Sequence, residues 1–270
     1  SEIYFNRNKF YAILTDPPYF RNVQYAELMD FCFVWLRQLI RTKHPEFTGL
    51  TTRHANELTG NFNMGRTIDH FTDGLSRVFR KMAEALKPGA PLAFTYHHNR
   101  LDAYYPVAVA ILDSGLVCSA SLPCPAEMGA SIHINGTGSS IIDTVFVCRS
   151  TGRFPRRWLA SNPEELARVV QADLQLLEQA QVKPTQGDTR CIVFGQLIRL
   201  AVWNLRNGWS ADRKVGERMA AVREWIEGFG GAESVLKELG EAYAEASPKQ
   251  IWEVNEEAKS YRTHADEISF

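Results

Sequence analysis

Residues 13–19 read Ile-Leu-Thr-Asp-Pro-Pro-Tyr, an apolar stretch that runs directly into Asp16-Pro17-Pro18-Tyr19. Neither proline has a backbone N–H, and each holds φ at about −65°. We therefore expect a strand that ends here, with carbonyl groups facing a pocket. The carboxylate of Asp16 accepts hydrogen bonds, and Tyr19 offers a flat aromatic face. Together they suit a planar group that carries an exocyclic amine, such as adenine.

These residue types also suit a specific chemistry on that amine. A nucleobase amine is a poor nucleophile because its lone pair is delocalised into the ring. Acceptors that hold both N–H bonds favour a pyramidal nitrogen, and they stabilise the positive charge that develops when it attacks a methyl group. The alternative is a strand that ends in a Pro-Pro turn, with Asp16 and Tyr19 merely solvated. The position of the motif directly after a strand favours the catalytic interpretation.

A longer string extends this motif. Residues 15–36, TDPPYFRNVQYAELMDFCFVWL, resemble the amino-methyltransferase motif of the adenine-specific DNA methylases that contain a zinc ribbon. Many N-methyltransferases share DPPY, whereas the longer string is much more specific. Its matching positions after DPPY are Asn22, Val23, Tyr25, Glu27, Leu28, Asp30, Phe31, Trp35 and Leu36. Weaker similarity continues through residues 92–98 and 139–149, and faintly through 187–195.

The resemblance implies an S-adenosylmethionine-dependent enzyme that methylates N6 of adenine in DNA, on a base flipped out of the stack. Catalysis is then assigned to Asp16, Pro17, Pro18 and Tyr19. Cofactor contacts are assigned to Asp16, Asn22 and Tyr25. Tyr19 is also expected to stack on the target base. The zinc ribbon of the family is not visible, because none of the five cysteines has C-x-x-C spacing. We expect reduced thiols and no metal site.

Further candidate substrate contacts lie outside the motif. His97, His98 and Asn99 follow an apolar strand, at the edge of an α/β sheet where ligands bind. A plain loop is the alternative there. Neighbouring strand residues point to opposite sides, so the two histidines are poor joint metal ligands. Gly136 and Gly138 belong to a polar loop with the composition of a target-binding segment.

The alternation of elements predicts an α/β fold, namely the C-terminal half of a Rossmann-like methyltransferase sheet over residues 1–150. The last two strands would form the antiparallel hairpin that ends a methyltransferase sheet. Helical spacing places Phe31, Val34 and Trp35 in the core. The expected strands cover residues 10–15, 91–96, 116–122 and 141–148, and the expected helices cover 24–41, 67–86 and 101–114.

Composition changes after Arg149, and residues 151–270 are expected to form an all-α appendage. It begins with a basic linker over 151–157. The appendage either packs on the sheet or recognises the target. The arginines at 149, 153, 156 and 157 are candidates for phosphate contacts, although such short clusters are more often solvated. The expected helices cover residues 163–181, 189–204, 211–228, 232–246 and 248–261.

Charge and hydropathy limit the partners. The net charge of −1 provides no global basic field, which weakens but does not remove the case for DNA. There is no apolar run of transmembrane length and no signal-peptide pattern. We therefore expect a cytoplasmic protein that makes no membrane contact.

A complete methyltransferase holds its cofactor on a glycine-rich loop that, in the resembling family, precedes DPPY. No such loop lies before Asp16. The glycines at 136–138 lie in a loop between strands with no helix to follow, and those at 230–231 open a helix but follow another helix instead of a strand. We expect a catalytic part whose sheet is completed by an upstream segment or a second chain, and which binds the cofactor weakly alone. Two alternatives stay open. One is an N-methyltransferase acting on RNA or a protein amide, whose relatives usually carry Asn in place of Asp16. The other is a non-catalytic scaffolding subunit.

Overall fold

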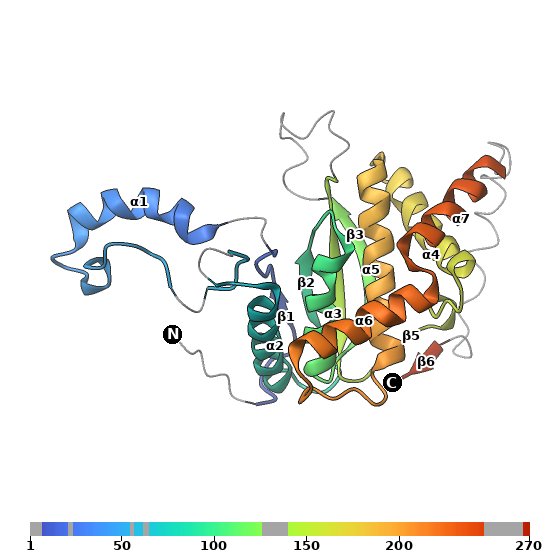
Figure 1. Cartoon of the computed structure of the whole chain (residues 1–270), viewed down its shortest axis with the longest axis horizontal. Helices are drawn as coiled ribbons and strands as arrows, with labels where there is room; N and C mark the ends of the chain where they lie inside the picture. Colours follow the sequence, from blue (N-terminus) through green and yellow to red (C-terminus); the bar gives the residue numbers. More distant parts are fainter. Residues whose placement is uncertain (1–6, 21–23, 55–56, 62–64, 126–139, 246–266) are drawn as a thin grey trace.

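A mixed four-stranded sheet forms the centre of the molecule (Figure 1). The computed structural model describes residues 7–20, 24–54, 57–61, 65–125, 140–245 and 267–270. The strand order is β1-β2-β4-β3, with β1 parallel to β2 and β4 antiparallel to both β2 and β3. The predicted mixed α/β architecture is confirmed. The strands are β1 (Ile13–Thr15), β2 (Leu92–Tyr96), β3 (Val117–Pro125) and β4 (Ile142–Arg149).

One face of this sheet carries the core. Burial alternates along β2 and β4, because successive side chains of a strand point to opposite faces. Phe94 and Phe146 pair in register on the buried face, with ring centroids 5.3 Å apart. On the opposite face Leu14 and Leu122 are exposed. Within the described residues, this second face is the less covered one.

Helices from both halves of the sequence cover the buried face. They include α2 (Ile68–Ala85), α3 (Tyr105–Asp113) after the 3-10 turn η3 (Leu101–Tyr104), and α5 (Gln186–Leu205). Phe79 of α2 meets Phe94 at 4.8 Å, and Tyr104 meets Phe194 of α5 at 5.7 Å. The C-terminal region therefore packs on the sheet, as one of the two predicted alternatives had it.

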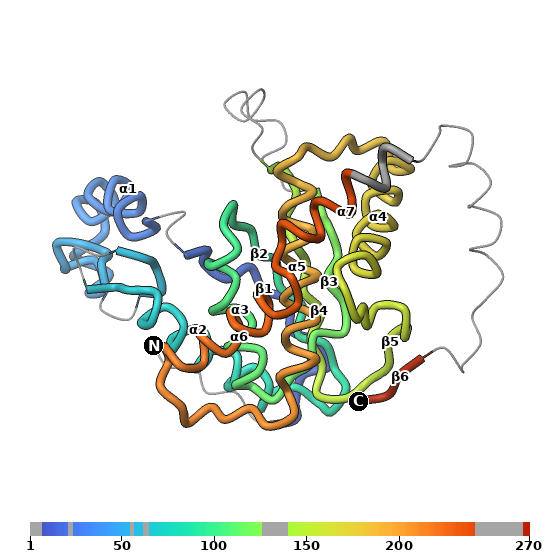
Figure 2. Tube along the Cα trace, turned by 45° about the vertical axis from the view of Figure 1, so that its right-hand side comes forward, coloured from blue at the N-terminus to red at the C-terminus, as the bar shows by residue number. Residues whose placement is uncertain are grey.

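The rest of the C-terminal region differs in one respect from the all-helical prediction. It contains α4 (Pro163–Gln179), α6 (Val215–Phe229) and α7 (Gly231–Glu245). However, the predicted linker contains the strand β5 (Arg153–Pro155), which the 3-10 turn η5 (Arg156–Trp158) follows directly. Strand β5 pairs with β6 (Glu267–Ser269) near the end of the chain (Figure 2). The helix predicted over 248–261 lies outside the described residues. None of the described helices combines the length and apolar character needed to cross a bilayer.

The segment we call the α1 lobe stands apart from this body (Figures 1 and 2). It comprises α1 (Tyr25–Ile40), the 3-10 turn η1 (Pro45–Phe47) and the described part of the loop to Asn61. The helix was predicted correctly, but the core placement of three side chains was wrong. Phe31, Val34 and Trp35 are 74%, 46% and 65% exposed. The reason is that α1 packs against its own loop and projects away from the sheet.

Candidate active site

Asp16 lies directly after β1, where the parallel register with β2 brings it beside Thr95. The hydroxyl groups of Thr95 and Tyr19 both donate to Oδ1 of Asp16, the second at 3.0 Å. Within the described residues, Oδ2 of this exposed carboxylate has no hydrogen-bond partner. One oxygen is thus fixed by the protein, and the other can accept a hydrogen bond from a ligand.

The two prolines and Tyr19 set the position of this carboxylate. Pro17 is buried, and Tyr19 is half-buried with its ring edge-on to Tyr96, 5.2 Å between centroids. Burial raises the pKa of the Tyr19 hydroxyl, and the charges of Asp143 and Asp16 act in the same direction. Tyr19 therefore keeps its proton and serves as a donor to Asp16. Since its ring packs on Tyr96, the residue also acts as a support for the carboxylate.

The predicted substrate contacts after β2 diverge. His97 is half-buried, with Nδ1 3.1 Å from the carbonyl oxygen of Ile142 and 3.9 Å from Oδ1 of Asp143. His98 instead accepts a hydrogen bond from the backbone N–H of Arg100 at 3.0 Å. Burial lowers the pKa of His98, which favours the neutral ring. Asn99 is exposed at the bend that follows. Of these three residues, His97 lies beside Asp143, an acidic residue of the site in addition to Asp16.

That residue, Asp143, was not found by the sequence analysis. It is the second residue of β4, and antiparallel pairing with β2 places it at the same sheet edge as His97. Burial raises the pKa of the Asp143 carboxyl, His97 opposes this, and the charge of Asp16 adds to it. An acidic residue at the start of a β-branched strand was the available signal. The site therefore holds two carboxylates and an imidazole, from three strands.

The predicted cofactor side is less complete. Tyr25 begins α1 and is partly exposed, and its pKa is raised by burial and by the charge of Asp16. Electrostatic influence therefore links Tyr25 to the Asp16 carboxylate. Asn22, Gly136 and Gly138 lie outside the described residues. Gly230, at φ 116°, ends α6 directly before α7, which is the helix–helix turn expected from the sequence.

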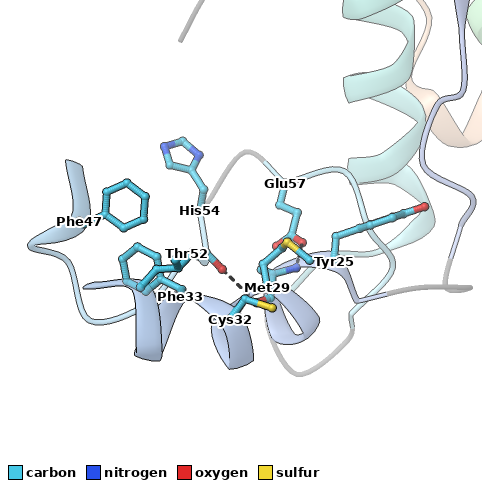
Figure 3. A pocket seen from close by; sticks show the side chains of 10 residues that line it. Tyr25, Met29, Cys32, Phe33, Phe47, Thr52, His54 and Glu57 are labelled. Atoms are coloured by element: carbon cyan, nitrogen blue, oxygen red, sulfur yellow. Dashed lines mark hydrogen bonds between the residues drawn. The ribbon is translucent and has the colours of Figure 1, made fainter. Parts of the chain in front are cut away.

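A cavity of about 430 Å³ lies in the α1 lobe (Figure 3). Its walls are mainly apolar, and Tyr25 points away from Phe33 and Phe47, toward the sheet body. Glu57 accepts a hydrogen bond from the N–H of Ala26 at 3.1 Å, at the start of α1. Apart from Tyr25, the cavity shares no residue with the cluster around Asp16. It is lined by Tyr25, Ala26, Met29, Cys32, Phe33, Leu36, Phe47, Thr52, His54 and Glu57.

Cysteines and possible metal ligands also occur among the described residues. All five cysteines are free thiols. Within the part of the chain that the structure describes, no three His, Cys, Asp or Glu side chains are grouped so that they could hold a metal ion. Comparisons of the chain with protein-family models, curated proteins and solved structures found no match.

Proposed function

We propose that this chain is the catalytic part of an S-adenosylmethionine-dependent methyltransferase that acts on N6 of adenine in DNA. The proposal rests on Asp16, which is held through one oxygen by Tyr19 and Thr95 at the end of β1 while its other oxygen has no hydrogen-bond partner among the described residues. The antiparallel pair β3–β4 at the end of the sheet supports the same proposal. Such a hairpin is what the resemblance to methyltransferases implies.

The chain's own residues would act mainly through electrostatics. Asp16 and the carbonyls near the two prolines accept hydrogen bonds from the target amine, which localises the lone pair on nitrogen. Developing positive charge is then stabilised by a carboxylate that is already oriented, so little reorganisation is needed. Tyr19 and Thr95 fix that orientation. When bound, S-adenosylmethionine supplies the electrophilic methyl group.

The methylated amine must lose a proton, and the second carboxylate gives a place for it. Asp143 has a raised pKa and lies at the same edge as Asp16, with His97 beside it. A carboxylate with a raised pKa is a better base than an ordinary aspartate. We assign Asp143 to accept this proton, directly or through His97.

The described residues fit the acceptor side of the reaction better than the cofactor side. Asp16 and Tyr25 are the candidate cofactor contacts that the structure describes, and both are partly open to solvent. Ligand sites usually bury well over half of a molecule of this size. We therefore expect weak or undetectable binding of S-adenosylmethionine to the 1–270 chain, which calorimetry measures directly. Micromolar affinity of the monomeric chain would contradict the view of an incomplete cofactor site.

The catalytic assignment is tested by Asp16→Ala. Methyl transfer to an adenine-containing oligonucleotide is measured for the 1–270 chain at millimolar S-adenosylmethionine, because the affinity for the cofactor is expected to be low. We expect a loss on the order of 100-fold or more, the scale of one lost electrostatic stabiliser. Asp102→Ala is the matched control, because Asp102 is an exposed carboxylate near the same edge that pairs with Arg100. Near wild-type transfer by Asp16→Ala would refute the assignment.

One observation favours a second candidate, a non-catalytic binding subunit. The α1 lobe exposes a large apolar surface, which in soluble proteins often marks a protein interface. If the wild-type chain transfers no methyl groups under these conditions, this candidate replaces the catalytic one.

A further inference from the structure

A second cavity, of about 500 Å³, lies between α2 and the segment that leads into α6. Its lining is dominated by positive charge. His70 and the acidic Asp73 and Asp212 complete the polar lining. The cationic residues are Arg77, Arg80, Arg213, Lys214 and Arg218. This concentration is notable because the whole chain has a net charge of −1.

The inner wall of this basic pocket is rigid. Arg218 is only 4% exposed and forms ion pairs with Asp73, at 2.8 Å, and with the buried carboxylate of Asp113. The same carboxylate binds Arg80 at 3.4 Å and accepts a hydrogen bond from Nε1 of Trp209 at 2.9 Å. Within the described residues, Nε of Arg218 and Nε of Arg80 are buried without a hydrogen-bond partner. The Arg218 guanidinium thus keeps an unused donor.

The outer wall carries charge that the protein does not neutralise. Arg77, Arg213 and Lys214 are exposed and form no ion pair with any residue that the structure describes. Asp212 offsets only part of this charge, so the outer wall stays net positive and an anion in the hollow would reduce the repulsion between the three cations. Scattered solvated charges would not share a cavity with a fixed arginine in its wall.

The start of α6 adds a further anion-binding element. Val215, the first residue of this 15-residue helix, lines the pocket. The N–H groups of Glu217 and Arg218 donate to the carbonyl oxygen of Lys214, which leaves those of Val215 and Gly216 for a ligand at the positive end of the helix dipole. Phosphate groups bind at helix N-termini for this reason. Here the helix end and the arginines face the same hollow.

We propose that this basic pocket binds a phosphate group, from a nucleic-acid backbone or from a free phosphate compound. Arginine and lysine side chains on two elements would contact the phosphate oxygens, with the first-turn N–H groups of α6 as further donors. Binding would require neither the cofactor nor Asp16. It can therefore fail or succeed independently of the proposed methyl transfer.

The test is binding of a fluorescent single-stranded oligonucleotide to the full 1–270 chain over a range of salt concentrations, without cofactor. The variant is Arg77→Ala/Arg213→Ala/Lys214→Ala. The control, Lys9→Ala/Lys43→Ala/Lys183→Ala, removes three positive charges from exposed positions that do not line the pocket. We expect the slope of log K against log salt to fall by about 2 in the pocket variant, as for three lost phosphate contacts on single strands. The control should retain the wild-type slope.

Calorimetric titration with inorganic pyrophosphate distinguishes the two sources of phosphate. Loss of pyrophosphate binding in the pocket variant, with oligonucleotide binding unchanged, would identify a small phosphate compound as the ligand. Equal losses in the pocket and control variants would overturn the proposal, since net charge alone would then explain them. The proposal would also be overturned if the wild type bound neither probe, or if the pocket variant bound both probes as the wild type does.

Discussion

Helices α1 and α3 are both rich in apolar residues, yet they are buried to opposite extents. In α3 every residue from Pro106 to Asp113 is buried, whereas in α1 only Ala26 is. The difference lies in what surrounds each helix. The sheet and the helices α2, α5 and α6 enclose α3, while α1 packs mainly against its own loop. An apolar helical pattern therefore predicts a helix with an apolar face, but it does not predict whether another element packs on that face.

The two regions are also held together differently. Aromatic packing joins the body, as in the stack of Phe94 on Phe146. The α1 lobe has one such stack, Phe33 on Phe47, and otherwise relies on polar contacts. Asp30 accepts hydrogen bonds from Thr52, and Glu57 pairs at 2.6 Å with the buried Arg66, which lies just beyond the lobe. The lobe is thus a segment whose shape depends on a few hydrogen bonds and ion pairs.

The largest contrast is expected from truncating one phenylalanine in each region. Phe146→Ala should lower the free energy of unfolding by about 3–5 kcal/mol, because it leaves a cavity at a fully buried site. Phe31→Ala should change it by less than about 0.5 kcal/mol, as for an exposed residue. Urea denaturation measures both values. A cost for Phe31→Ala close to that of Phe146→Ala would show that α1 is covered in solution, for example by a second copy.

Two aspartates, Asp173 in the body and Asp30 in the α1 lobe, should change the free energy of unfolding in opposite directions with pH. Both effects should be smaller than that of Phe146→Ala, and that of Asp173 should be the larger of the two. Burial raises the pKa of Asp173 to about 6, against the opposing effects of Gln196 and Arg199. A raised carboxyl pKa favours the protonated folded state. Its stabilisation is therefore complete below the ordinary value of about 3.9 and is lost as the pH rises through about 6, at most about 3 kcal/mol.

The measurement is the free energy of unfolding of wild type and Asp173→Asn at pH 4 and pH 7. Relative to the variant, wild type should lose stability between these two values. Glu178→Gln is the control, an exposed carboxyl-to-amide change on the same helix, and it should follow the wild type. A wild type that gains stability relative to Asp173→Asn as pH rises would show that Asp173 is ionised in the fold.

The smallest effect is expected from Asp30 in the α1 lobe. Hydrogen bonds from the N–H of Thr52 and the hydroxyls of Thr51 and Thr52 lower the pKa of Asp30, and Arg53 adds to this. A lowered carboxyl pKa stabilises the fold above the ordinary value and loses that effect as the pH falls through the folded-state value. Acid should therefore destabilise the loop around Thr52, whereas protonation of Asp173 at the same pH stabilises the folded body. Hydrogen exchange of this loop tests it: Asp30→Asn at neutral pH should exchange faster than wild type, and unchanged protection would contradict the role.

Local signals in the sequence were sufficient for the ends of α2, but not for the starts of α5 and α6, which lie three residues before and four residues after the predicted ones. The predicted range 67–86 matches α2 within one residue at each end, and Pro88-Gly89 is the stop signal after it. The strand β6 was missed because a three-residue strand is defined by its partner β5, far away in the sequence. The burial of Trp35 was wrong because periodicity reports amphipathicity and not the presence of a covering surface.

The candidate site shows the same limit. Asp16 and Tyr19 were found because they are adjacent in a motif. Thr95 and Asp143 were not, because only the register of β1, β2 and β4 brings them to the same edge. Polar residues inside apolar strands are the signal to search for in such cases.

The pairing of β5 with β6 also has a consequence for the order of folding. It joins Arg153–Pro155 to Glu267–Ser269, and the backbone of Phe270 exchanges hydrogen bonds with that of Gly152. Closing a flexible loop of about 110 residues costs roughly 4 kcal/mol of chain entropy. The three residue pairs of β5 and β6 offset this cost only after the intervening helices have formed and shortened the loop. The β5–β6 pair should thus form late in folding and separate early in unfolding. A probe attached near Phe270 would report the first loosening of the molecule before the sheet itself is disturbed.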